Sequence, residues 1–137
     1  MKKALLWAAC VAVVFVMALP VSAQSGRPAV LKGEVNFAFV SGGRTLPAGE
    51  YTIEIGDKGI RFLDAKERVV QVMFANPQQE NRNEERPRLV FRHYGDQYFL
   101  GQIWTRDHSV DFPKSRTEHH LQVSLRTEEN TLTIAMR

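Results

Sequence analysis

The residues best suited to metal or acid–base chemistry in this sequence are its four histidines, His93, His108, His119 and His120. The carboxylates nearest to them along the chain belong to Asp107, Asp111 and Glu118. Zinc sites need several ligands, usually at recognisable spacings such as H-E-x-x-H, and no such spacing occurs here. A metal-dependent hydrolase would have to use His108, His119 and His120. We expect His93, which falls within an aromatic strand, to be packed and hydrogen-bonded.

The sequence lacks the patterns that activate other nucleophiles. No serine lies in a G-x-S-x-G elbow, and no glycine-rich loop follows a strand and opens a helix, as phosphate sites require. The one cysteine, Cys10, lies in an N-terminal apolar segment that we expect to be removed. We therefore assign no catalytic residue and no cofactor, and we expect a protein that is not an enzyme.

Three aromatic side chains indicate binding rather than a reaction. Tyr94, Phe99 and Trp104 could line the mouth of a barrel and hold a small apolar ligand or a partner protein. The alternative is that these side chains belong to the core. Nucleic acid is not an expected partner, because the basic residues near these aromatics form only a thin strip.

The same aromatics lie in the stretch Arg88–Trp104, which predicts two strands joined at Gly95-Asp96. A glycine at the first central position of a two-residue loop favours a type II′ turn. This turn predicts cross-strand pairs of Tyr94 with Gln97, His93 with Tyr98, Phe91 with Leu100 and Leu89 with Gln102. One face would carry Leu89, Phe91, His93, Tyr98, Leu100 and Trp104, and the other Val90, Arg92, Tyr94, Phe99 and Ile103. Because both faces are apolar, we expect the hairpin to be central in its sheet.

Alternating apolar residues predict further short strands on both sides of the hairpin. Their ranges are 34–40, 51–55, 60–64, 69–74 and 131–136. The three strands between residues 51 and 74 form an antiparallel meander. Residues 75–87 and 105–114 lack such a pattern and are expected to be irregular. The predicted fold class is all-β and mainly antiparallel, either a small β-sandwich or a closed β-barrel of seven to eight strands.

The segment Ser115–Arg126 fits two structures. Its first four residues, ending at Glu118, have the S-x-x-E form of a capping box, which begins helices. The residues that follow also alternate between apolar and polar types, as in a strand. The capping box favours a short helix near 115–122, and we expect at most this one helix.

The N-terminal segment has the pattern of a secretory signal peptide. Lys2 and Lys3 precede an apolar run that extends to Leu19, and small residues around Ala23 form a cleavage site. We expect a cleaved signal peptide at 1–23, a flexible tail at 24–31 and a single β domain at 32–137. The apolar run is too short to span a membrane, so we expect no membrane span in the mature chain.

Removal of the signal peptide changes the composition of the remaining chain. The number of basic residues falls from 18 to 16, against 15 acidic residues, so the net charge favours neither nucleic acid nor an anionic membrane. The mature chain has no cysteine, so its stability must come from core packing rather than from disulfides. The expected location is the periplasm or the outside of the cell.

Three stretches together resemble a family of small exported bacterial proteins of unknown function. They are LPAGEYTIEI at 46–55, LVFRHYGDQYFLGQIW at 89–104 and PKSRTE at 113–118. Proteins of that family share a signal peptide, an LPAG-x-Y corner, a VF-x-x-YGD-x-YFL-x-x-x-W hairpin and a Ser-Lys/Arg-x-Glu element near the C-terminus. The resemblance implies export, a similar architecture and a helical C-terminal element, and it implies no activity.

We therefore expect an exported small β domain that acts as a non-enzymatic binding or envelope-associated module. Its partner would be an envelope protein or a small apolar ligand. Two alternatives are the metal-dependent hydrolase described above and a structural subunit that adds an edge strand to a neighbour in a surface assembly. The sequence leaves the oligomeric state open.

Overall fold

The computed structural model describes residues 28–75, 79–80, 86–126 and 129–137. The expected signal peptide at 1–23 and most of the expected tail at 24–31 lie outside these residues. The end of the tail is a correction, because strand β1 begins at Ala29. Val30 and Leu31 belong to this strand since they pair with β4, and pairing with a neighbouring strand fixes their backbone.

The first sheet has four antiparallel strands in the order β1-β4-β5-β6. Their bounds are Ala29–Val35, Gly49–Gly56, Gly59–Leu63 and Val69–Met73. In β4, Tyr51 and Ile53 are buried while Thr52 and Glu54 are only half-buried, as the period of a strand requires. The meander expected between residues 51 and 74 is confirmed by β4, β5 and β6.

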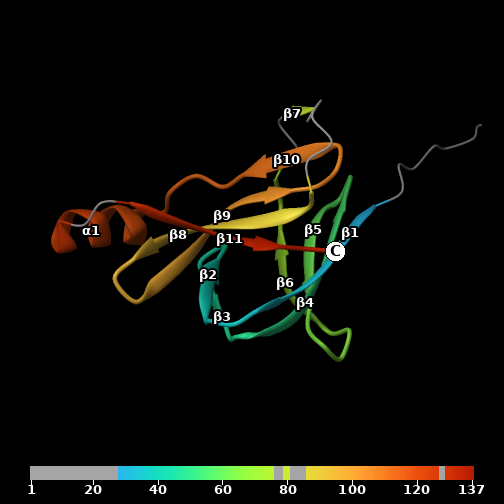
Figure 1. The fold of residues 1–137 in the computed structure, drawn as a ribbon, viewed down its shortest axis with the longest axis horizontal. Coiled ribbons are helices and arrows are strands. Elements are labelled where there is room, and N and C mark those ends of the chain that lie inside the picture. Colours follow the sequence, from blue (N-terminus) through green and yellow to red (C-terminus); the bar gives the residue numbers. More distant parts are fainter. Residues whose placement is uncertain (1–27, 76–78, 81–85, 127–128) are drawn as a thin grey trace, which may run out of the picture.

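The second sheet is built around the hairpin of β8 and β9 (Figure 1). Its main order is β11-β8-β9-β10-β7, with the bounds Asn130–Ala135, Arg88–Tyr94, Gln97–Trp104, His108–Asp111 and Gln79–Glu80. A small hairpin of β2 (Phe39–Ser41) and β3 (Arg44–Leu46) joins β9 through a parallel pair of Val40 and Phe99. Both strands of the central hairpin therefore have neighbours, as expected.

The two sheets pack against each other around one apolar core (Figure 1). In the described residues they form a small all-β sandwich rather than a closed barrel, which decides between the two predicted forms. Core side chains come from both sheets and include Leu31, Ile53, Phe62, Leu89, Phe91 and Ile103. Eleven strands are described, more than the seven to eight expected, because β2, β3 and β7 are only two or three residues long.

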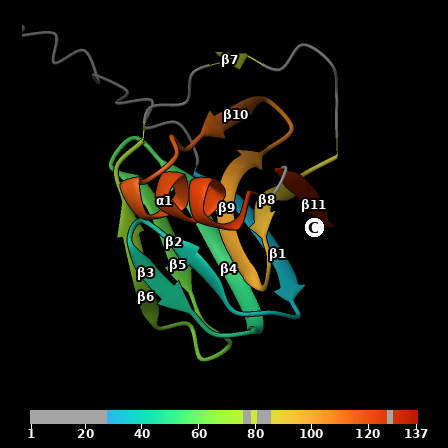
Figure 2. The same ribbon diagram turned by 90° about the vertical axis from the view of Figure 1, so that its left-hand side faces the viewer.

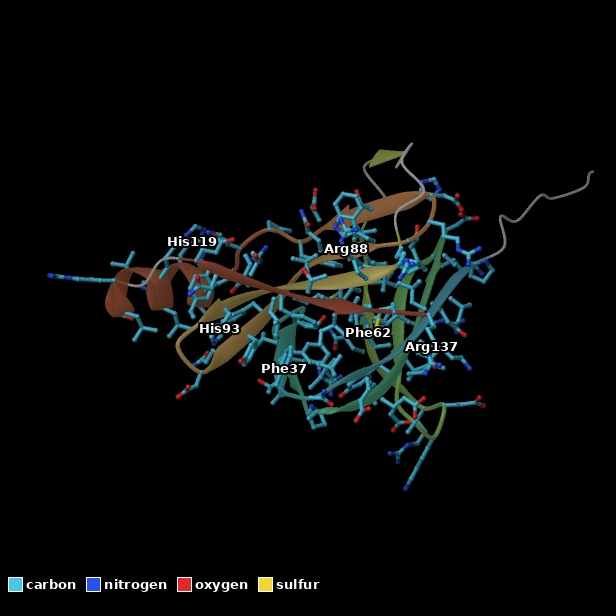
Figure 3. All side chains as sticks on the ribbon, viewed as in Figure 1. Phe37, Phe62, Arg88, His93, His119 and Arg137 are labelled. Atoms are coloured by element: carbon cyan, nitrogen blue, oxygen red, sulfur yellow. The ribbon has the colours of Figure 1, made fainter. Side chains whose placement is uncertain are left out.

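The residues at the C-terminus connect the second sheet to the first. Arg137, labelled in Figure 3, exchanges two backbone hydrogen bonds with Lys32 of β1, at N···O distances of 2.7 and 2.8 Å. Gly33 permits this close approach, because a Cβ at that position would collide with the sulfur of Met136. The edge strands β1 and β11 are thus joined at one end of the sandwich.

Two segments differ from the sequence expectation. The strand expected at 34–40 is interrupted, because β1 ends at Val35 in one sheet and β2 begins at Phe39 in the other. The break lets the chain change sheets while Val35 and Phe39 both remain in the core. The segment 105–114, expected to be irregular, contains β10. Its two central residues are both buried, so β10 lacks the alternation by which strands are recognised.

The predicted hairpin register holds near the turn and shifts farther along. Tyr94 pairs with Gln97, His93 with Tyr98 and Phe91 with Leu100, as predicted. Leu89 pairs with Ile103 instead of Gln102, because Gly101 is an extra residue that forms a β-bulge. Because of this extra residue, Ile103 and Trp104 lie on the opposite faces to those predicted. Ile103 lies on the core face, and Trp104 lies on the other face opposite Arg88.

The one described helix, α1 (Arg116–Leu125), is confirmed as the capping box predicted, and it extends past the expected end at 122. It lies at the turn end of the β8–β9 hairpin, at one extremity of the molecule (Figure 1). Figure 2, viewed from that end, shows α1 in front of the strands. Glu118 is its only buried residue, so α1 is held on the domain mainly at one point.

Candidate functional site

The point that holds α1 is a buried ion pair between Glu118 and Arg92 of β8. Both carboxylate oxygens take part: Oε1 accepts from Nε of Arg92, and Oε2 accepts from Nη2 at 3.0 Å. The third guanidinium nitrogen, Nη1, donates to the carbonyl of Phe112 at 2.9 Å. The side chains of Arg92 and Glu118 are only 12% and 2% exposed. Such burial is tolerated because each charge is paired and hydrogen-bonded.

Glu118 also forms the N-terminal cap of α1. The hydroxyl of Ser115 accepts from the Glu118 amide at 3.2 Å, and Oε2 of Glu118 accepts from the Ser115 amide at 3.3 Å. This is the capping box that the sequence pattern predicted. The same carboxylate therefore begins the helix and attaches it to the hairpin.

Tyr94 completes the coordination of the carboxylate. Its hydroxyl donates to Oε1 of Glu118 at 3.2 Å, and its side chain is fully buried. Burial, together with the negative charges of Glu118 and Glu129, raises the pKa of the Tyr94 hydroxyl. Each oxygen of Glu118 thus accepts two hydrogen bonds, so all the lone-pair positions of this carboxylate are occupied.

Lys114 lies at the margin of this cluster. Its ammonium group pairs with Glu129 and also donates to Gln122 at 3.4 Å. The hydrogen bond to Glu129 raises the pKa of Lys114. We call Arg92, Tyr94, Lys114, Ser115 and Glu118 the anchor cluster, because together they fix α1 and the segment before it.

Gly101 makes room for the anchor cluster. A Cβ at this position would lie 3.1 Å from Nη1 of Arg92 and 3.3 Å from the carbonyl oxygen of Val90. The carbonyl of Gly101 accepts from the amide of Phe112 at 2.9 Å. The bulge therefore leaves space for the guanidinium of Arg92, and its carbonyl also positions the segment that precedes α1.

A hollow of about 210 Å³ adjoins the anchor cluster. Its apolar lining comes from Val40, Phe99, Leu100, Phe112 and Pro113. Its polar lining includes Ser41, Arg92, Ser115 and Glu118. Three separate parts of the chain thus meet here: the β2–β3 turn, the hairpin and the start of α1.

The three aromatic residues predicted to bind a ligand have different surroundings. Tyr94 is buried beneath α1, and Phe99 is 4% exposed but lines the hollow. Trp104 is half-buried; its indole N–H donates to Gln102 at 3.1 Å, and the guanidinium of Arg88 lies 4.3 Å from its ring centroid. The three share one face of the hairpin but do not gather at a common mouth, because Phe99 lies opposite Arg92 near the turn and Trp104 lies opposite Arg88 at the far end of the strands.

The histidines are distributed over three elements. His93 stacks on Tyr98 with ring centroids 4.4 Å apart, so the expected packing of His93 is confirmed, while its expected hydrogen bond stays a prediction. His108 is exposed in β10, and His119 and His120 are exposed on α1. Figure 3 shows His119 on the helix and His93 on the hairpin. Among the described residues, no group of three or more His, Cys, Asp or Glu side chains is placed to hold a metal ion.

Tyr98 forms the centre of a partly exposed stack of rings. Phe37 lies on its other side, with centroids 4.0 Å apart. Phe37 and His93, both labelled in Figure 3, therefore enclose Tyr98 between them. This stack extends the core toward the turn end of the hairpin.

Sequence reasoning missed the partnership of Arg92 with Glu118. One signal was present: Arg92 is a charged residue on an otherwise apolar hairpin face, and such a residue needs a partner when it is buried. The stretches that carry the family resemblance also make local contacts. The Tyr51 hydroxyl donates to the carbonyl of Pro47 and closes the LPAG-x-Y corner.

None of the described helices combines the length and the apolar character needed to cross a membrane. Comparison of the chain with protein-family models, with curated proteins and with solved structures gives no match in any of the three.

Proposed function

We propose that the protein is an exported, non-enzymatic binding module that takes up an apolar group of an envelope partner or of a small ligand. The binding site is the hollow beside the anchor cluster. The observation that carries this proposal is a hollow with a mainly apolar wall, whose two charged lining groups, Arg92 and Glu118, are already paired with each other. A site of this kind favours an apolar guest with few polar groups.

The state of Glu118 supports binding rather than acid–base chemistry. A general base needs a free lone pair within reach of its substrate. The four hydrogen bonds that Glu118 accepts leave none free. The hollow therefore supplies shape and an apolar surface, while the anchor cluster keeps its walls in place.

The hollow can be blocked without removing the anchor cluster. Val40 is half-buried on β2 and lines the hollow, so Val40→Phe would fill part of it. Val30→Phe on β1, where the native side chain is 47% exposed, adds the same atoms outside the hollow and serves as the control. Native mass spectrometry of protein purified from the envelope of an exporting host measures bound ligand. The same spectrum tests cleavage after Ala23.

The expected result is a mass excess of a small organic molecule, or a co-purified envelope protein, that is lost in Val40→Phe and kept in Val30→Phe. A guest retained equally by both variants would place binding elsewhere. A stoichiometric metal in the spectrum would instead support a hydrolase based on His108, His119 and His120.

A second candidate function, the structural subunit, is favoured by strand β6. This strand is an edge of the first sheet, and residues 69–74 contain no charged residue and no proline. Val69, Val72 and Phe74 are 49%, 47% and 87% exposed. Natural edge strands usually carry charges or bulges that prevent pairing. Among the described residues, Arg44 covers part of this edge by donating to the carbonyl of Val70 at 3.1 Å.

Light scattering at increasing protein concentration tests this candidate. Assembly through β6 predicts a mass that rises with concentration and returns to the monomer value in Val72→Lys. A monomer mass at every concentration would count against the structural subunit and leave the binding module unaffected.

A further inference from the structure

The outer side of α1 is exposed along its whole length. Arg116, His120 and Val123 follow one another at spacings of four and three residues, so they form one row on the helix. His119 lies beside this row. All four are exposed, and the exposed fraction of Val123 reaches 77%. An apolar side chain thus lies between groups that donate hydrogen bonds.

The charge on this side of α1 has one sign. Arg116 and Arg126 mark its two ends, about 15 Å apart for a helix that rises about 1.5 Å per residue. Within the described residues of the helix, the only carboxylate is Glu118, which faces inward and is paired with Arg92. Arg116 and Arg126 therefore give the outer side of α1 a positive charge, although the mature chain as a whole is near neutral.

The position of α1 leaves this side accessible to a flat surface. The helix lies beyond both sheets at the turn end of the hairpin (Figure 1), and it is the foremost element when the molecule is viewed from that end (Figure 2). The charged residues next to the inner side of α1 form ion pairs: Arg92 with Glu118, and Lys114 with Glu129. Asp96, in the adjacent hairpin turn, and Glu129 are exposed acidic neighbours among the described residues.

We propose that this face of α1, formed by Arg116, His119, His120, Val123 and Arg126, docks on an anionic lipid surface. The guanidinium groups bind lipid phosphates, the imidazoles donate hydrogen bonds to them, and Val123 enters the headgroup layer. With two full charges and one apolar side chain, the attachment is weak and reversible. None of these five residues lines the hollow, so the membrane contact is independent of the proposed guest.

Vesicle co-sedimentation at low ionic strength tests the proposal on the exported protein. One set of vesicles contains equal parts of phosphatidylglycerol and phosphatidylethanolamine, and the other contains phosphatidylcholine alone. The protein sediments with the first set only. Arg116→Gln lowers the partition coefficient about fivefold, and addition of Arg126→Gln lowers it about 25-fold in total, because each cation near an anionic surface contributes by roughly this factor. Val123→Ser lowers it further at fixed charge.

The control is Lys66→Gln, which removes one exposed cation from the β5–β6 turn of the first sheet and leaves partitioning unchanged. Equal sedimentation with both vesicle sets would overturn the proposal, and so would an effect of Lys66→Gln as large as that of Arg116→Gln. Binding to polyglutamate without binding to vesicles would indicate that the partner is an acidic protein, and it would also reject the membrane proposal. Val40→Phe, which blocks the hollow, should still bind vesicles. A failure of the proposed ligand binding can therefore be distinguished from a failure of the proposed membrane binding by α1.

Discussion

Two carboxylate–guanidinium pairs in this molecule have the same chemistry and different surroundings. Glu118 and Arg92 lie 26 residues apart in the sequence and are almost fully buried. Asp64 and Arg68 lie four residues apart in the β5–β6 turn, with side chains 20% and 70% exposed. The second pair closes a turn that is already held by backbone hydrogen bonds, from the Asp64 amide to the Arg68 carbonyl and from the Glu67 amide to the Asp64 carbonyl. The first pair connects α1 to strand β8 of the second sheet.

The difference shows that an ion pair matters for what it connects and for how much water reaches it. Exposed pairs gain little, because water and salt screen both charges. A buried pair gives little net stability over an apolar substitute, yet the loss of one partner leaves a charge without compensation. We therefore expect large effects at the anchor cluster and small ones in the turn.

The largest effect is expected from Glu118→Ala. This change leaves the Arg92 guanidinium buried without its partner and removes half of the capping box, so the free energy of unfolding should fall by about 3–5 kcal/mol. Urea denaturation followed by tryptophan fluorescence measures it. His119→Ala, one position along the exposed side of α1, is the matched control and should change little. A Glu118→Ala variant as stable as the control would show that the pair is not what holds α1.

Tyr94→Phe is expected to cost about 1.5 kcal/mol, because it removes one hydrogen bond to a charged acceptor and keeps the ring. It should also change the response to alkali. The raised pKa of Tyr94 means that the fold favours the neutral hydroxyl; this contribution is complete below the ordinary pKa of about 10 and is lost as the pH rises through the higher folded value.

Denaturation above pH 10 should therefore weaken the wild type more steeply than Tyr94→Phe. Part of the loss of stability above pH 10 should persist in Tyr94→Phe, because burial and the charge of Asp64 also raise the pKa of Tyr51. Parallel curves for the two proteins would mean that Tyr94 does not titrate in contact with Glu118.

Ser115→Ala is expected to cost about 1 kcal/mol, the usual effect of losing an N-terminal cap. Glu118 keeps its bonds to Arg92 and Tyr94, so the helix should stay attached and lose order only in its first turn. Far-ultraviolet circular dichroism and amide hydrogen exchange at Thr117 and Glu118 measure this. Loss of the whole helix signal would make the cap, and not the ion pair, the main support of α1.

Arg68→Ala is expected to have the smallest effect on the free energy of unfolding, close to the error of the measurement. The fold lowers the pKa of Asp64, chiefly through hydrogen bonds from the backbone and side chain of Arg68. Any contribution of this carboxylate is present above its unfolded pKa and is lost as the pH falls through the lower folded value. Acid titration by NMR should show the pKa of Asp64 rising in the variant. A large loss of stability at neutral pH would contradict the comparison.

Local patterns predicted the fold where neighbours in the sequence decide it. The turn at Gly95-Asp96 set the hairpin register as far as Phe91, and the S-x-x-E pattern located the start of α1. The prediction failed at Gly101, because a β-bulge is defined by a partner strand and a bound side chain rather than by the residues beside it. β10 was missed for a related reason: it forms by pairing with β9, and its own residues lack the apolar–polar alternation that predicts a strand.

The candidate site was less predictable than the fold. Arg92 and Glu118 each had a local role in the sequence pattern, one on a strand face and one in a cap. Their contact depends on how α1 returns over the hairpin, which no spacing in a single sequence reveals. Of the three aromatics predicted to bind, Phe99 lines the hollow, Tyr94 is buried beneath α1, and Trp104 lies opposite Arg88 because of the register shift.

The backbone bonds between Lys32 and Arg137 also bear on the order in which this fold can form. They join residues from nearly opposite ends of the described chain, and contacts of such long sequence separation are slow to close. Because a chain is synthesised from its N-terminus, the hydrogen bonds between Lys32 and Arg137, which connect the two sheets, can form only after residue 137 has been added. Until then the two sheets lack this tie, and a chain that lacks its last long-range contacts is easier to unfold and thread through a narrow pore.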